Sequence, residues 1–68
     1  MQMDIKKNFT YHPPKEGQPE KYTEIREQAH SLAETLQALC PQSRELSLVL
    51  TNLEQVVFWA NASIARNE

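Results

Sequence analysis

Two long stretches of the chain carry hydrophobic residues at helical spacing. In the first, Pro19 suits the opening turn of a helix, and Glu20 is favourable near its positive end. Its apolar face recurs every three or four residues, at Tyr22, Ile25, Ala29, Leu32, Ala33, Leu36 and Leu39. Pro41 ends the pattern. The first stretch therefore predicts a helix over residues 20–39.

The second stretch predicts a helix over residues 42–66. Glu45 in its first turn and Arg66 in its last both favour the helix dipole. One stripe provides a core face, formed by Leu46, Val49, Leu50, Leu53, Val56, Val57, Ala60 and Ile64. Because only a few residues join the two helices, we expect them to pack antiparallel as a hairpin.

A shorter element precedes this hairpin. Ile5 and Phe9 are four residues apart, which predicts a short helix within residues 1–9. Pro13 and Pro14 then favour an extended, stiff strap over residues 10–19. No strand pattern or repeat occurs in the sequence. The predicted fold is all-α, with one domain spanning residues 1–68.

The second helix is too apolar for a single core face. Residues 46–65 include one charge, Glu54, and polar interruptions that argue against a membrane span. Leu48, Phe58, Trp59 and Ala62 point away from the core stripe. Phe58 and Trp59 could fold under the N-terminal segment of their own chain, but few residues are available to cover them. We therefore expect these four side chains to form a homo-oligomer interface.

Composition also favours self-association. A chain of 68 residues has a small core, and Cys40 is its only cysteine, so no internal disulfide can form. A lone cysteine and an N-terminus without an apolar run suggest a reducing compartment and no signal peptide. His12 and His30 lack further ligands at metal-binding spacing. We expect no metal and no cofactor.

The charge pattern and the motifs exclude other classes of function. The formal net charge is −2, and seven basic residues are scattered, which argues against binding duplex nucleic acid. Gly17 is the only glycine, so a glycine-rich phosphate loop is absent, and no catalytic Ser, His and acid arrangement is suggested. We expect a protein that is not an enzyme and has no catalytic residues.

Three side chains are candidates for ligand binding. Tyr11 on the stiff strap could stack on a nucleobase, or it could pack the strap onto the hairpin. Arg26, at the edge of the first helix's core stripe, could grip a phosphate or remain solvated, paired with Glu27 or a neighbouring chain. Arg66 could be a helix-end charge or a ligand contact.

Three motifs carry a family resemblance. They are Tyr11-His12-Pro13-Pro14, the opening of the second helix at residues 43–48, and the closing string from Phe58 to Glu68. Together they resemble the phage anti-CBASS protein 2 family of cyclic-oligonucleotide sponges, over roughly residues 9–68. The resemblance implies a helical homohexamer in the cytoplasm of the infected bacterial host. Such a protein binds cyclic dinucleotides such as cyclic GMP-AMP without cleaving them and deprives host CBASS effectors of their signal.

The resemblance also assigns roles to residues. It implies that Tyr11, with its neighbours His12 and Pro13, stacks on the bases of a cyclic dinucleotide, and that Arg26 contacts phosphate. Family members carry lysine at the position of Arg26, and the two cations differ in geometry and hydration, so ligand preference could differ. A separate site for cyclic trinucleotides is implied at Arg66.

A second function remains open from the sequence. The apolar strip of Leu48, Phe58 and Trp59 could instead serve a protein-binding helical oligomer that inhibits a host enzyme. Binding of cyclic nucleotides distinguishes this alternative from a sponge.

Overall fold

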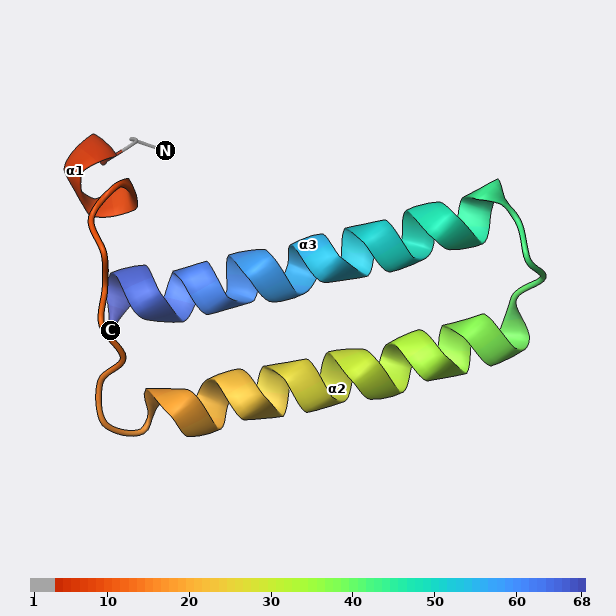
Figure 1. Ribbon diagram of the computed structural model, residues 1–68, viewed down its shortest axis with the longest axis horizontal. Coiled ribbons are helices and arrows are strands. Elements are labelled where there is room, and N and C mark those ends of the chain that lie inside the picture. Colours follow the sequence, from red (N-terminus) through yellow and green to blue (C-terminus); the bar gives the residue numbers. More distant parts are fainter. Residues whose placement is uncertain (1–3) are drawn as a thin grey trace.

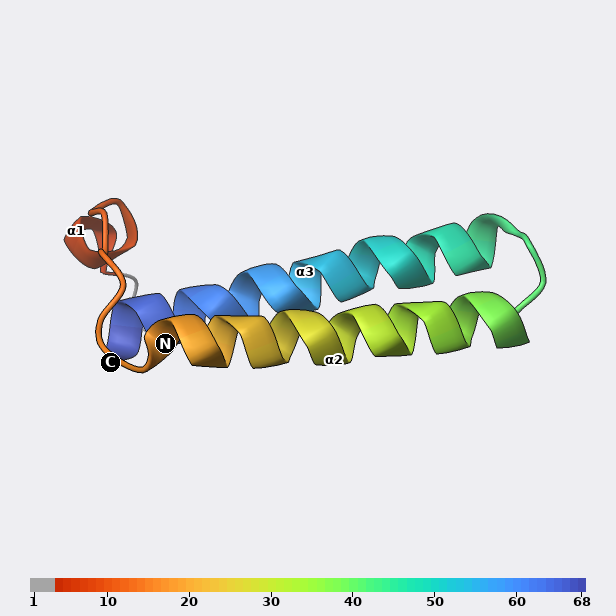
Figure 2. The same ribbon diagram turned by 60° about the horizontal axis from the view of Figure 1, so that its bottom comes forward.

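The computed structural model describes residues 4–68, which form a helical hairpin with one short additional helix. The elements are α1 (Ile5–Asn8), α2 (Gln18–Leu39) and α3 (Arg44–Asn67), and no strand occurs within this described range. The two long helices lie side by side and antiparallel, and α1 lies at the open end, near the C-terminal turn of α3 (Figures 1 and 2). The predicted all-α class and the hairpin are confirmed.

The short helix α1 is held by local contacts. The carboxylate of Asp4 caps it by accepting a hydrogen bond from Lys7 N at 3.0 Å, and Phe9 N closes it on Ile5 O. Of the predicted helix within residues 1–9, residues 1–3 lie outside the described part of the chain. Ile5 and Phe9 are 70% and 85% exposed, so the face that they were expected to share remains mostly uncovered within the described chain.

Helix α2 begins at Gln18, earlier than the predicted residue 20. The preceding Gly17 adopts a left-handed conformation, with φ of 85° and ψ of −17°, which turns the chain directly into the helix. Pro19 then occupies the first turn, where its missing N–H costs nothing. Residues 18 and 19 are therefore helical, and the non-helical connecting segment covers residues 9–17.

Helix α3 begins at Arg44 because Ser43 caps it. The Ser43 hydroxyl accepts from Leu46 N at 3.1 Å, and Ser43 itself is extended. Glu45 lies in the first turn and Arg66 in the last, as the sequence pattern predicted. The serine cap places the helix start two residues after the predicted residue 42.

The core between the two helices is thin. Leu46 is the one buried hydrophobic side chain among the described residues, and the other positions of the two facing stripes are half-buried or exposed. On α2, Leu32 and Leu39 were expected on the apolar face, but they remain 47% and 76% exposed because they lie beyond the arc that α3 covers. Val49 and Val56 were expected in the core face, but Val56 remains 59% exposed and Val49 is also exposed. Both lie at the edge of the stripe. They stay exposed because one partner helix covers a narrower arc than the apolar stripe spans. The hairpin alone leaves much apolar surface uncovered.

Candidate functional site

The connecting segment presents Tyr11 at the open end of the hairpin. The Tyr11 side chain is 80% exposed, so it does not pack the segment onto the helices. The neighbouring His12 is half-buried, and its Nε2 lies 2.7 Å from Lys7 O, which makes Nε2 the nitrogen that donates in this contact. Pro13 and Pro14 follow, both exposed. The ring of Tyr11 is thus available to an external partner.

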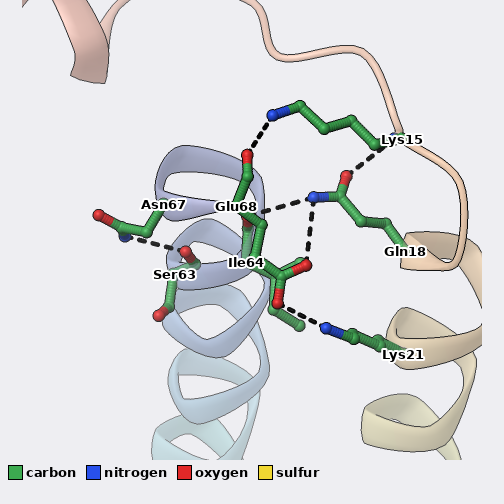
Figure 3. A network of polar contacts seen from close by, with 7 residues as sticks. All are labelled: Lys15, Gln18, Lys21, Ser63, Ile64, Asn67 and Glu68. Carbon is green, nitrogen blue, oxygen red and sulfur yellow. Dashed lines mark hydrogen bonds and ion pairs between the residues drawn. The ribbon is translucent and has the colours of Figure 1, made fainter.

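Polar contacts on both sides of Tyr11, one from α1 and one from the connecting segment, fasten this part of the chain to the C-terminal end of α3. On one side of Tyr11, Lys7 Nζ donates to Asn67 Oδ1 at 2.8 Å. On the other side, Lys15 Nζ donates to the main-chain oxygen of Glu68. Figure 3 shows the second fastening, in which Gln18 lies between Lys15 and the end of α3.

Gln18 is the most buried polar residue in the described chain, with an exposed fraction of 3%. Its Oε1 accepts from Lys15 N at 2.9 Å, while its Nε2 donates to Ile64 O at 3.4 Å and to Glu68 Oε1 at 3.5 Å. The other carboxylate oxygen of Glu68 pairs with Lys21 Nζ at 2.6 Å. The hydrogen bond from Lys21 lowers the pKa of the Glu68 carboxyl below its usual value of 4.5, although desolvation opposes this shift.

Arg26 lies at the rim of a shallow groove between α2 and α3. The polar rim is formed by Arg26, His30 and Glu54, and the floor by Ala29, Ala33, Leu50, Leu53 and Val57. Arg26 is exposed, and its Nη2 donates to Thr23 Oγ1 at 3.4 Å. A guanidinium has five N–H donors, so this long bond leaves donors for an anion. His30 is engaged with Glu34, at 2.8 Å.

Tyr11 and Arg26 do not line the same groove of one chain. Arg26 follows Gln18 by eight residues, which is about 12 Å along α2, whereas Tyr11 precedes that helix.

The outer face of α3 carries an aromatic cluster. Phe58 and Trp59 are 59% and 56% exposed, and their rings meet edge to face with centroids 5.0 Å apart. Leu48 is exposed and Ala62 is half-buried. The N-terminal segment of the same chain does not bury the two aromatic rings, so both remain more than half exposed in the single chain.

Arg66 belongs to this same cluster. Its guanidinium carbon lies 5.9 Å from the centroid of the Trp59 ring, a distance typical of a cation–π contact. The seven-residue separation of Trp59 and Arg66 places them on one face of α3. Arg66 is thus a helix-end charge held over a ring, and its side chain remains partly accessible.

The residues that fasten the connecting segment were not predicted from the sequence. Gln18 was placed in the strap, yet it lies four residues before Tyr22 and so extends the core stripe of α2 by one turn. That spacing was the available signal. Asn67 and Glu68 offered none, because their contacts come from residues far away in sequence.

Among residues 4–68, no helix is sufficiently long and apolar to cross a membrane. Within the same range, no cluster of three or more His, Cys, Asp or Glu side chains could hold a metal ion.

Comparison with known proteins identifies one family. The family model described as Acb2/Tad1, hairpin domain, matches residues 1–65. Neither a curated protein nor a solved structure matches the chain significantly. The matched residues include nearly the whole hairpin, and the resemblance to phage anti-CBASS protein 2 is confirmed at the level of the family. The family implies a phage anti-CBASS sponge for cyclic oligonucleotides. The chain belongs to the Acb2/Tad1 hairpin-domain family.

Proposed function

We propose that this protein binds and sequesters cyclic dinucleotide second messengers, such as cyclic GMP-AMP, without cleaving them. In the cytoplasm of an infected host, this sequestration would block the activation of CBASS effectors. The observation that carries the proposal is Tyr11, a ring that is 80% exposed on a segment fastened at both ends to α3. Such a ring is available to stack on a base.

Arg26 supplies the second part of the proposed site. It is a cation with free donors at the rim of a groove, which suits a phosphate. Within one chain, Tyr11 does not line the groove at Arg26. We therefore place the site between chains. A two-fold axis supplies each residue twice, and a cyclic dinucleotide has two bases and two phosphates. His12 and Pro13 follow Tyr11 directly and complete the proposed dinucleotide site.

The exposed apolar faces support assembly. Leu48, Phe58, Trp59 and Ala62 form the proposed interface on the outer face of α3, and six copies form the proposed assembly. Arg66 lies at the end of that face, and we place the second type of site, for cyclic trinucleotides, at this residue. Its contact with Trp59 orients the guanidinium and couples this site to the interface.

Replacement of Tyr11 tests the proposed dinucleotide site. We expect Tyr11→Ala to weaken binding of cyclic GMP-AMP by about thirtyfold or more, to the point of abolishing it, because base stacking contributes about 1–3 kcal/mol for each of the two bases. Tyr11→Phe is the matched control, since it keeps the aromatic face and loses only the hydroxyl. Isothermal titration calorimetry measures both, and the mass of the oligomer should stay unchanged. Normal binding by Tyr11→Ala would remove Tyr11 from the site.

The exposed strip of Leu48, Phe58 and Trp59 also favours a second candidate, a helical oligomer that inhibits a host enzyme through this surface. The same calorimetry distinguishes the two functions. If no cyclic di- or trinucleotide binds, the sponge proposal fails and the protein-binding function takes its place. If cyclic GMP-AMP binds and is recovered intact after heat release, the sponge is supported.

A further inference from the structure

We propose that Gln18 is a positioning residue which, together with the last turn of α3, holds the connecting segment in the pose that the Tyr11 site needs. We call the set of Lys7, Lys15, Gln18, Asn67 and Glu68 the clasp. The inference rests on the proposed function only in the role that it gives to Tyr11. The fastening itself is a property of the free protein.

The burial of Gln18 is the first step. A primary amide that is 97% removed from water needs hydrogen bonds, because an unpaired buried amide is costly. Gln18 finds partners on two different elements: the Lys15 main chain in the connecting segment, and Ile64 and Glu68 in α3. One side chain thereby joins the connecting segment, the start of α2 and the end of α3 (Figure 3).

The two fastening points enclose Tyr11. Lys7 reaches Asn67 on one side of it, and Lys15 reaches Glu68 on the other. Asn67 is itself oriented, because its Nδ2 donates to Ser63 O at 2.9 Å and leaves Oδ1 for Lys7. Both anchors are thus fixed to the same helical turn, and the enclosed segment contains two prolines that limit its freedom further.

No comparable restraint acts on the Tyr11 side chain itself. With four-fifths of its surface exposed, the ring depends on its backbone for its position. If the clasp opens, the segment samples many conformations, and ligand binding must then order it at a cost in affinity. The clasp therefore acts on binding through preorganisation and has no need to touch the ligand.

Backbone ¹⁵N relaxation of the free protein tests the clasp directly. In the wild type, we expect order parameters of about 0.85 at the amides of Thr10, Tyr11, His12, Lys15 and Glu16. In Gln18→Ala, we expect these values to fall below about 0.6, whereas the values in α2 and α3 stay unchanged. The matched control is Gln37→Ala, an exposed glutamine on the same helix that lies outside the clasp.

A second variant covers the case in which Gln18→Ala fails to fold. The double variant Asn67→Ala, Glu68→Ala changes only exposed side chains at the end of α3. It removes the side-chain oxygen that accepts from Lys7 and the two carboxylate oxygens that accept from Gln18 and Lys21, while the main-chain oxygen that accepts from Lys15 remains. We therefore expect the loss of order at Thr10, Tyr11 and His12, next to the opened anchor. For either variant, we expect the affinity for cyclic GMP-AMP to fall roughly tenfold, while the oligomer persists.

The outcomes separate this inference from the proposed function. Unchanged order parameters in the folded variants would overturn the clasp, even if the wild type binds cyclic GMP-AMP. Lost order with unchanged affinity would overturn its positioning role. If the wild type binds no cyclic nucleotide, the proposed function and this positioning role both fail. Loss of order in the variants would then show only that the fastening exists.

Discussion

Glu68 is the residue on which the connecting segment and both long helices converge. It is the last residue of the sequence given and follows α3 directly, and its oxygens accept from Lys15, Gln18 and Lys21. These contacts favour the ionised carboxylate, and the hydrogen bond from Lys21 has the largest effect on its pKa. The contact between α2 and the end of α3 is therefore sensitive to acid.

The pKa of Glu68 gives a prediction with a definite sign. Because it is lower in the folded protein than the usual 4.5, the stabilisation is fully present above pH 4.5. It is lost as the pH falls through the folded-state pKa. We expect NMR titration of the Glu68 carboxyl to give a midpoint below 4.5, and Lys21→Ala to move that midpoint upward. A wild-type midpoint at or above 4.5 would contradict this assignment.

Sequence reasoning identified the exposed candidates at this scale better than the buried ones. Tyr11 and Arg26 were recognisable because an aromatic ring beside two prolines, and a cation at the edge of an apolar stripe, are local patterns. Gln18 was missed because its role depends on partners 46 and 50 residues away. The stacking role of Tyr11 and the phosphate role of Arg26 remain predictions.

At the scale of elements, the turn at Gly17 determines how the connecting segment meets α2. Its φ of 85° is a conformation that residues with a Cβ rarely adopt. A Cβ added there would meet no atom within 4 Å, so the restriction is conformational and involves no clash. The turn brings the Gln18 side chain close to the Lys15 main chain, and Lys15 N donates to Gln18 Oε1 at 2.9 Å.

We expect Gly17→Ala to destabilise the protein by about 1–2 kcal/mol, the cost of a left-handed conformation for a residue with a side chain. Glu16→Ala, at the neighbouring turn position, is the control and should have little effect. Denaturant unfolding at one fixed protein concentration measures both, because the stability of an oligomer depends on concentration. Equal stabilities of Gly17→Ala and the wild type would show that the turn is not restricted.

The helices could be predicted because their signals are local. The apolar spacing of α2 and α3 and the stop at Pro41 all act within a few residues. The observed helix starts differ from the predicted residues 20 and 42 because the N-cap residues determine them. Ser43 caps α3, and Gly17 turns the chain into α2. The edge positions Val49 and Val56 were wrongly placed in the core, since periodicity does not reveal how wide an arc one neighbouring helix covers.

At the scale of the whole molecule, a single chain exposes too much surface. Its accessible surface is 5794 Å², whereas a compact monomer of 7.9 kDa exposes about 4400 Å². The excess, about 1400 Å², is larger than the roughly 800 Å² that each partner buries in a standard protein interface. The exposed Phe58 and Trp59 contribute to the accessible surface of the single chain. These areas support the proposed homo-oligomer, which the sequence suggested through the apolar outer face of the second helix.

Native mass spectrometry of the purified protein with cyclic GMP-AMP tests the central proposal most directly, because one spectrum reports both assembly and ligand. We expect a closed oligomer, with six copies as the proposed number, that carries whole numbers of intact cyclic GMP-AMP molecules. A monomer at micromolar concentration would contradict the proposed assembly. An oligomer without ligand, or one carrying ligand heavier by one water and therefore cleaved, would contradict sequestration.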